Sequence, residues 1–494
     1  MSRIGSFFRS VVGAPIRKRG FDAANSDRSS SWSPRATSIV SETMGSLSKL
    51  RAKSRDLVQN SDVAASAIRE LTNATVGHGI MPQAASDSDV FNDLVDRRFE
   101  QWSNRCEPRQ QMTFYSLQNQ AVKAMFVSGE AFLVRVRPPK SENMPTPLWL
   151  KLYEADMVDD NLNKQTEDGG RIVQGIEFDS KDRLIAYWFF QNHPGDAFTW
   201  SARSSEDTYI RIPAEDVIHL MEHAENRPQQ VRGVPRLAPV INDIREMGEY
   251  KSAELMKQRI AACFGVIFQN TEDDPDGDKA LCDSSNLKID EIYPGLIAYA
   301  PGGSTVTTVN PPSTLGYPEY VKQHLQGIGA GLGIPYAQLT GDLTKVNFSS
   351  GRMGLGGFIR KTEAVQWFTV IPGLCEKIWQ WFISADYQAG NIVTAAVKVD
   401  WNTQRFPSVN PSQDEAARSK RLRNGVSTLA MEIAQEGNNP KRVFRQRQQE
   451  NALLDSLDLT FDSDPRNRTL SGTNQPLYDV SVSKGKKPRK GTEA

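Results

Sequence analysis

Cysteine is scarce in this sequence, and long hydrophobic runs are missing. The four cysteines among 494 residues, Cys106, Cys263, Cys282 and Cys375, follow neither a disulfide framework nor a metal-ligand spacing. Unpaired thiols are typical of proteins that stay in a reducing cytoplasm. No apolar run approaches the roughly 18 residues of a membrane-spanning helix, and the apolar block near the N-terminus is too short for a signal peptide. These absences predict a soluble intracellular protein that contacts no membrane.

An excess of either charge is also missing. The 59 basic and 59 acidic side chains cancel, so the chain lacks the global electrostatic footprint of a protein that binds nucleic acid or membranes. Any contact with DNA must therefore be local or loose. The length is sufficient for about two to four domains with a sizeable buried core.

The motifs of common enzyme classes are incomplete. The sequence has no G-x-x-x-x-G-K-[ST] phosphate-binding loop and no G-x-S-x-G nucleophile elbow. The glycine-rich run from Gly327 to Gly333 does not complete the dinucleotide-binding pattern G-x-G-x-x-G. We therefore expect no enzymatic activity and no cofactor.

One motif keeps a catalytic alternative open. His219, Glu222 and His223 match H-x-x-E-H, which on a helix places two imidazoles on one face for Zn²⁺, with a carboxylate as base. The preceding residues IRIPAEDVI alternate like a strand that enters a turn, and no third ligand stands out. We therefore expect structural histidines and no bound metal. The alternative function is a zinc-dependent hydrolase.

The dominant positive signal is a long helical segment at 233–264. Pro235 and Pro239 fall in the first turn, where a missing N–H costs little, and apolar residues then recur at three- and four-residue steps. At 1.5 Å per residue the helix would be about 40 Å long, which is unusual inside one compact domain. An amphipathic helix on a globular core would show the same pattern.

The rest of the chain changes between helical and strand-like blocks, which predicts an α+β fold. Residues 1–45 form a basic arm, with five basic and no acidic residues among the first twenty. Helical periodicity follows at 49–76 and from about Val90 and Ser116. The period then changes to two, which predicts a β-rich module at 130–222.

An acidic insert lies between two strand-like runs after the long helix. The runs are 264–270 and 296–310, and between Asn270 and Glu291 eight acidic residues accompany two basic ones. The elements expected next are a helix at 317–332, a polar loop at 334–352, a helix at 353–389 kinked at Pro372, a strand, helices from 412 to 457 and a basic tail.

Three segments carry a resemblance to a known family. They are IPAEDVIHLMEHAENRPQQVRGVPRLAPVI at 212–241, GIPYAQLTGDLTKVNFSSGRMG at 333–354, and PSVNPSQDEAARSKRLRNGVSTLAMEIAQEGNNPKRVFRQRQQE at 407–450. With the order of the elements, they make the chain from about 50 to 455 resemble the portal proteins of tailed bacteriophages, specifically the lambda-like family. The family's Asp-Pro-x-Lys-Glu stands here as Asn410-Pro411-Ser-Gln-Asp414, which keeps the shape of the pattern but differs in charge.

The resemblance implies a ring at one vertex of a capsid, expected to be a dodecamer, with a central channel for packaging and ejecting double-stranded DNA. It also implies the portal fold, in which an α/β wing, a helical stem, a small β-containing clip, a kinked helix and a helical crown are combined. Matched in order along the chain, the regions are a flexible basic arm (1–45), the wing (46–232), the first stem helix (233–264), the clip (265–316), the second stem helix (317–333), the tunnel loop (334–352), the kinked helix with a returning wing strand (353–411), the crown (412–460) and a disordered basic tail (461–494).

The partners implied by the resemblance are further copies of the chain, double-stranded DNA bound without sequence preference, the terminase large subunit, major capsid and scaffold proteins, and head-tail connector proteins. The location implied is the capsid vertex of the virion, after assembly in the cytoplasm of the bacterial host. On the stem, the apolar residues Ile244, Met256 and Ile260 are predicted to contact neighbouring subunits.

The tunnel loop is predicted to touch DNA in the channel. The residues expected to do so are Lys345, Asn347, Ser349, Ser350 and Arg352. A sparse ring of cations with neutral donors would brush phosphates without holding them, which suits movement in both directions. The alternative is a loop between subunits in which Lys345 pairs with a neighbouring carboxylate.

The acidic insert in the clip is predicted to be a docking surface for the motor or a connector. Its acidic residues around Pro275 and Gly277 are Asp273, Asp274, Asp276 and Asp278. Like charge there would repel DNA and attract a basic face on a partner. The alternative is a solvated loop without a partner.

Overall fold

The computed structural model describes the larger part of the chain, with gaps. The residues described are 36–196, 209–223, 227–262, 266–269, 297–299, 305–308, 316–344, 346–404, 406, 410–436, 438 and 440–459. For 260–262, for Phe348 and for the three short segments between 266 and 308, only the backbone is described. Helices and strands are combined in these residues, so the predicted α+β class is confirmed. Most of the predicted arm and the whole predicted tail lie outside them.

Helices build the first part of the body. They are α2 (Ile39–Thr43), α3 (Leu47–Asn60), α4 (Asp62–Val76), α5 (Asp89–Ser103) and α6 (Phe114–Ser128). The single helix predicted at 49–76 is two helices. Ser61 ends α3 and caps α4, because its Oγ accepts a hydrogen bond from the backbone N–H of Ala64.

The β-rich module predicted at 130–222 contains two antiparallel sheets. In the first, β2 (Glu130–Val136) pairs with β3 (Trp149–Tyr153) and β9 (Val217–Met221). The second has the order β4-β5-β6-β7-β8, with strands β4 (Lys164–Gln165), β5 (Arg171–Val173), β6 (Ile176–Phe178), β7 (Leu184–Phe190) and β8 (Tyr209–Pro213). Phe132, Tyr187 and Phe189 join the two sheets in one buried cluster. A third pairing, between β1 (Met81–Ala84) and β13 (Val399–Asn402), returns the chain to its N-terminal part.

The main core contains an aromatic cluster centred on Phe99. The ring centroids of Trp102, Phe114, Trp379 and Phe382 lie between 5.0 and 5.5 Å from that of Phe99. Burial of each such side chain stabilises the fold by about 1.5–3 kcal/mol. The cluster therefore fixes the helix at 376–388 to α5 and α6.

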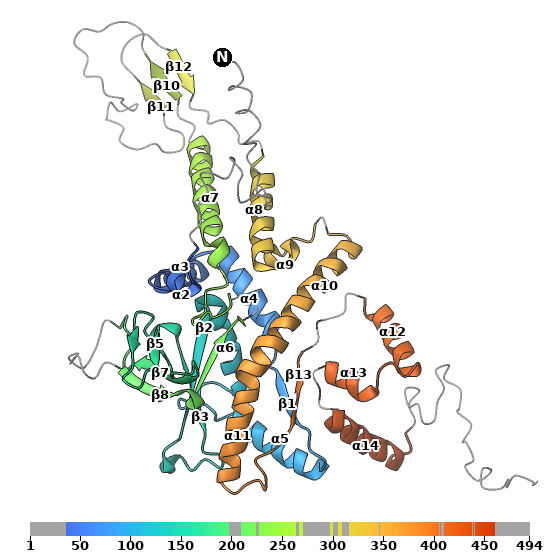
Figure 1. Cartoon of the computed structure of the whole chain (residues 1–494). Coiled ribbons are helices and arrows are strands. Elements are labelled where there is room, and N and C mark those ends of the chain that lie inside the picture. The colour runs from blue at the N-terminus through green and yellow to red at the C-terminus, as the bar shows by residue number, and fades with distance from the viewer. Residues whose placement is uncertain are drawn as a thin grey trace, which may run out of the picture.

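Two helices project from the body as a stalk, the name we keep for α7 and α8 (Figure 1). α7 (Ile241–Ala262) runs outward and α8 (Tyr317–Leu332) returns, and at their far end lies a three-stranded sheet of β10 (Val266–Gln269), β11 (Ile297–Tyr299) and β12 (Thr305–Thr308). The predicted strand at 264–270 and the second helix are confirmed, whereas the run predicted at 296–310 contains two short strands, β11 and β12. The first helix begins later than predicted, at Ile241, because a 3-10 turn at Ala238–Val240 that contains Pro239 precedes it.

A helical rod of three segments crosses the body (Figure 1). After the short helix α9 (Tyr336–Thr340), α10 (Phe348–Val365) continues into a π-helical segment (Gln366–Cys375) and then into α11 (Glu376–Gln388). Pro372 lies in the π-helical segment, where wider turns accommodate a residue that has no N–H to donate. The rod changes direction there, in agreement with the predicted kink.

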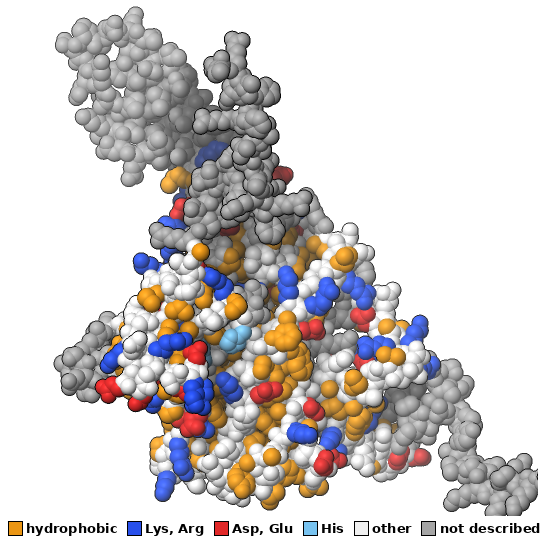
Figure 2. Space-filling model, in the orientation of Figure 1, with side chains coloured by type: hydrophobic (Ala, Val, Ile, Leu, Met, Phe, Trp, Pro, Cys, Tyr) orange, Lys and Arg blue, Asp and Glu red, His pale blue; other side chains and the backbone are white. Residues whose placement is uncertain are grey.

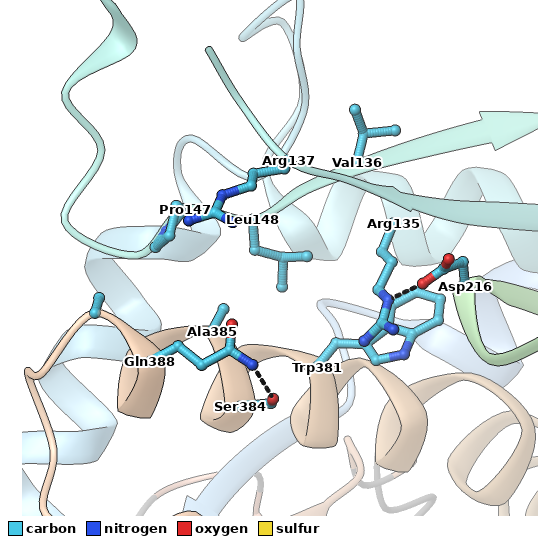
Figure 3. A pocket seen from close by; sticks show the side chains of 11 residues that line it. Arg135, Val136, Arg137, Pro147, Leu148, Asp216, Trp381, Ser384, Ala385 and Gln388 are labelled. Atoms are coloured by element: carbon cyan, nitrogen blue, oxygen red, sulfur yellow. Dashed lines mark hydrogen bonds and ion pairs between the residues drawn. The ribbon is translucent and has the colours of Figure 1, made fainter. Parts of the chain in front are cut away.

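Trp381 holds α11 against the end of β2 (Figure 3). Its Nε1 donates a hydrogen bond to the carbonyl oxygen of Glu215 at 3.1 Å, and the guanidinium of Arg135 lies 5.6 Å from its ring centroid. Arg135 also forms an ion pair with Asp216. A pocket of about 410 Å³ remains between β2 and α11.

Three C-terminal helices form a group beside α10 (Figure 1). They are α12 (Pro411–Arg423), α13 (Leu429–Gln435) and α14 (Pro440–Ser456). Apolar side chains on this group, among them Val426 and Leu453, are exposed. Among the residues that the structure describes, no helix is long and apolar enough to cross a membrane.

Candidate functional site

The apolar stripe of α7 is divided between the body and the solvent. Near the body, Ile244 and Met247 are only 2% and 3% exposed, because they pack into the core of the same chain. Farther out, Leu255 and Met256 are 52% and 57% exposed. The prediction that Ile244 contacts a neighbouring subunit therefore needs correction, since its own chain already buries it. Met256 is accessible, and the side chain of Ile260 lies outside the described residues.

Aromatic contacts hold the two stalk helices together. The ring of Tyr250 on α7 stacks on Tyr317 of α8 at a centroid distance of 5.7 Å, and it lies 4.8 Å from the ring of Tyr320. Near the body, Gly331 of α8 leaves space beside Val240, whose Cγ1 would lie 2.7 Å from an added Cβ. The stalk is thus a paired element, and at its base α8 packs against the turn that precedes α7.

The loop before α10 is shorter than predicted. Residues 334–352 were expected to form one loop, but α9 occupies the first part and α10 begins at Phe348. Asn347 is the N-cap of α10, because its Oδ1 accepts a hydrogen bond from the backbone N–H of Ser350 at 2.8 Å. Ser349 and Ser350 therefore lie in the first helical turn.

Asp342 organises the start of this loop. Its Oδ1 accepts hydrogen bonds from the backbone N–H of Thr344 at 3.0 Å and from the Thr344 hydroxyl at 2.6 Å. The hydroxyl of Tyr336 donates a hydrogen bond to Oδ2 of Asp342 at 3.2 Å. These hydrogen bonds lower the pKa of Asp342, and those from Thr344 have the largest effect. Leu343 is 69% exposed next to this turn, and Lys345 lies outside the described residues.

Arg352 connects α10 to the C-terminal helices. Its Nη2 lies 3.0 Å from Oδ1 of Asp414 on α12. The residue predicted to touch DNA is therefore engaged in an ion pair within the chain. Asp414 belongs to the segment Asn410-Pro411-Ser-Gln-Asp414, whose charges differ from the pattern of the family.

The stalk is joined to the body through a buried ionic network that the sequence did not reveal. At its centre is Glu130, the first residue of β2, which is fully buried. Its Oε1 accepts a hydrogen bond from Arg232 at 2.7 Å, and its Oε2 accepts one from the backbone N–H of Gly233 at 2.8 Å. His219 Nε2 also lies 2.8 Å from Oε2. Burial alone would raise the pKa of Glu130, but Arg232, His219 and Arg51 together hold it well below its usual range.

Arg232 extends the network to other elements. Its guanidinium donates hydrogen bonds to the carbonyl oxygens of Ala155, Val158 and Gln174 at 2.9, 3.1 and 2.8 Å. Every one of these groups is buried, so each charge and donor needs its partner. The network holds the segment just before α7 in one position relative to both sheets.

Two glycines allow the backbone segments at this junction to meet. A Cβ on Gly233 would lie 2.1 Å from the carbonyl oxygen of Gly129, and a Cβ on Gly129 would lie 2.5 Å from the carbonyl carbon of Val234. Gly129 also has φ +89°, a conformation that favours glycine. The sequence did contain one signal for this site. Glu130 is a charged residue that directly follows Ser128-Gly129 and begins an apolar strand.

The H-x-x-E-H residues do not form a zinc site. His219 lies on β9, as the alternating pattern predicted, and its Nε2 faces Glu130. Glu222 instead accepts a hydrogen bond from Arg236 at 2.8 Å. Among the described residues, Glu154, Asp156 and His193 bring possible metal-ligand atoms within 4.8 Å of one another. Arg55, however, forms ion pairs with both of these carboxylates. A positive guanidinium at the carboxylates disfavours a cation there.

Ion pairs attach the C-terminal helices to the body. Besides Arg352 and Asp414, Lys441 pairs with Asp89, and Arg445 pairs with Asp93. All of these side chains are partly exposed, so salt screens the pairs.

We therefore expect the variant Asp89→Asn/Asp93→Asn to loosen this attachment. In limited proteolysis, cleavage between the body and α14 should become a few-fold faster than in the wild type, and added salt should reduce the difference, because the lost pairs are electrostatic. Asp87→Asn, which removes an exposed neighbouring charge, is the control and should match the wild type. Equal cleavage in all three proteins would show that the pairs do not attach the helices.

The fold and this site define a protein in which a buried ionic junction carries a helical stalk. A sequence model described as "Phage portal protein, lambda family" matches residues 25–366. The chain belongs to this family and is a phage portal protein of a capsid vertex, as its sequence predicted. The family is structural, and nothing supports the hydrolase alternative.

Curated relatives agree with this assignment. The probable portal protein of Halomonas phage phiHAP-1 is 27% identical over 424 residues, which cover 80% of this chain and 79% of that protein. Portal protein B of Escherichia phage lambda is 19% identical, with 85% and 86% covered, and the portal protein of Escherichia phage N15 is 20% identical, with 85% and 87% covered.

Solved structures with a similar chain include the neck of a native gene transfer agent particle, computed with C12 symmetry. That chain is 13% identical, with a TM-score of 0.45 and coverage of 80% of this chain and 94% of that one. A portal protein of the HK97 family from Corynebacterium diphtheriae is 10% identical, with a TM-score of 0.33 and coverage of 73% and 95%.

Proposed function

We propose that the protein assembles into a ring, expected to be a dodecamer, whose central channel passes double-stranded DNA. The observation that carries the proposal is the stalk of α7 and α8, which bears a small sheet at its outer end and, at its base, leads through α9 and a short loop into the α10–α11 rod. In this assignment α7 and α8 are the stem, β10 to β12 belong to the clip, and α12 to α14 form the crown.

Exposed apolar side chains supply the surface that ring assembly needs. On the stalk they include Leu255 and Met256, and on the π-helical segment Trp367 and Phe368 are 51% and 71% exposed. Figure 2 shows hydrophobic side chains gathered along the course of the long rod. An apolar surface of this kind marks an interaction site, and repeated copies of the chain around an axis would cover it. Negative-stain microscopy of the purified protein tests this directly: rings with a central hole support the proposal, and compact monomers contradict it.

In the proposed ring, the loop before α10 faces the channel and Lys345 contacts DNA phosphates. One lysine per subunit among neutral side chains gives a weak, salt-dependent grip that does not stop the DNA. Neutral net charge of the chain suits such a channel. Asn347, Ser349 and Ser350 cap and begin α10 but are exposed, so in this proposal they offer neutral hydrogen-bond donors to the same phosphates.

We expect Lys345→Ala to form normal rings but to package or retain DNA less well, with the largest deficit at low salt, where the lysine contributes most. The measurement is a DNA packaging assay with ring formation scored in the same preparation. Lys361→Ala is a matched control for loss of one positive charge. If Lys345→Ala packages DNA as well as the wild type at every salt concentration, Lys345 does not contact the DNA.

The clip insert with Asp273, Asp274, Asp276 and Asp278 lies outside the described residues, and we propose that it docks the terminase motor. Replacement of the four aspartates by asparagine should weaken binding of the terminase large subunit about tenfold at low salt, because long-range attraction to a basic partner face is lost. Rings should remain intact. Unchanged affinity at low salt would contradict this role.

The remaining proposed partners are major capsid and scaffold proteins around the wing and head-tail connectors at the clip. We place assembly in the cytoplasm of the bacterial host, before the ring becomes part of the virion. Copurification of rings with these proteins from infected cells is the corresponding test.

A further inference from the structure

A cavity of about 710 Å³ opens beside the second sheet, the one formed by β4 to β8. Within the described part of the chain, its lining includes no residue of β10 to β12 or of the loop before α10. Its walls come from the first turn of α2, from β5, β6, β7 and β9, from the segment 227–231 and from Lys377 at the start of α11. Apolar side chains form much of its lining, and they include Ile176, Phe178, Leu184 and Met221. The cavity therefore offers an apolar surface that a partner could cover.

Most charged side chains around this cavity already have partners. Arg171 pairs with Asp182 at 2.8 Å, Arg227 pairs with Glu42 at 3.0 Å, and His219 lies 2.8 Å from Glu130. The carboxylates of Asp182 and Glu42 offset the charges of the two arginines, and Glu130 already engages His219.

Two basic side chains in the same cavity have no such carboxylate partner. Within the described ranges, no ion pair joins His223 or Lys377 to a carboxylate, and both side chains line the cavity. Burial lowers the pKa of Lys377, and burial together with His219 and Lys377 lowers the pKa of His223. An anion bound between them would offset the charge of Lys377 and would favour the protonated form of His223, which the lowered pKa otherwise disfavours.

We propose that this cavity docks an acidic segment of a partner protein, in which a carboxylate side chain stands beside an aliphatic or aromatic one. The carboxylate would bind His223 and Lys377, and the apolar side chain would cover Leu184, Ile176 and Phe178. The N-terminal arm of the chain itself is a poor candidate, because its first twenty residues carry five positive charges and no negative ones. That the partner acts in capsid assembly rests on the proposed function, whereas the binding chemistry rests on the cavity.

The experiment uses assembled rings of the full chain and a library of random hexapeptides displayed on an unrelated carrier. Selection on wild-type rings should enrich peptides that combine Asp or Glu with an aliphatic or aromatic residue. Fluorescence anisotropy of an enriched peptide then gives its Kd. For rings of His223→Gln/Lys377→Gln, the Kd should rise about tenfold, because two charge-assisted contacts are lost. Lys151→Gln, which removes an exposed charge away from the cavity, should leave it unchanged.

A second variant tests the apolar half of the site. Leu184→Ser should weaken the same peptide several-fold, because it removes apolar area from the cavity wall. Enrichment of peptides without acidic residues, equal Kd values in all the rings, or displacement of the library by a short DNA duplex would overturn the proposal. Because microscopy scores ring formation in the same preparations, loss of peptide binding by intact rings is distinguished from failure of the portal function.

Discussion

Glu130→Gln is expected to lower the free energy of unfolding by about 3–5 kcal/mol, the largest effect of a single substitution that we predict. The carboxylate is fully buried, and it forms hydrogen bonds with Arg232, His219 and the backbone N–H of Gly233. Glutamine keeps the shape of the side chain but leaves the buried guanidinium without its counter-charge. Urea unfolding followed by tryptophan fluorescence measures the loss.

Two controls separate the network from a general effect of losing a carboxylate. Glu167→Gln removes an exposed carboxylate and should change the stability very little. Glu130→Asp keeps the charge but shortens the side chain, so an intermediate loss is expected. A loss below about 1 kcal/mol for Glu130→Gln would show that the pair with Arg232 contributes little to the fold.

The same network predicts how stability depends on pH. The pKa of Glu130 in the folded protein is lower than its value of 4.5 in the unfolded chain. The ionised carboxylate therefore stabilises the fold above pH 4.5, and this contribution is lost as the pH falls through the folded pKa. The wild type should lose stability more steeply than Glu130→Gln below pH 4.5, and parallel curves would contradict the assignment.

Met256→Asp is expected to abolish ring assembly while the subunit remains folded. Met256 is 57% exposed on the outer half of α7, so aspartate is tolerated in the free chain. In a ring the same position would carry an unpaired charge into every contact between subunits, at a cost of several kcal/mol each. Light scattering after gel filtration measures the mass, and circular dichroism checks the fold.

Position-matched variants on α7 make this prediction specific. Met256→Leu keeps the apolar surface and should assemble normally. Gln258→Asp adds the same charge on another face of the helix and should also form rings. Rings of normal mass from Met256→Asp would show that the exposed part of the stripe is not an interface.

Several elements could be predicted from the sequence, because they depend on residues close together in the chain. Periodic apolar residues marked the helices of the body and of the stalk, and alternation placed His219 on a strand. Pro372 indicated the change of direction in the long rod. The boundaries were less accurate, since caps such as Ser61 and Asn347 act through a single hydrogen bond that periodicity does not show.

The family could also be inferred from the sequence alone, because long segments such as 333–354 keep their pattern. The tertiary structure alone decided which surfaces remain available. Ile244 and Met256 share one helical pattern, yet the body buries the first and leaves the second exposed. Glu130 meets Arg232 across 102 positions of the chain, and no local pattern encodes such a contact. Local sequence sets periodicity and capping, whereas burial and ion pairing depend on which distant segments the fold brings together.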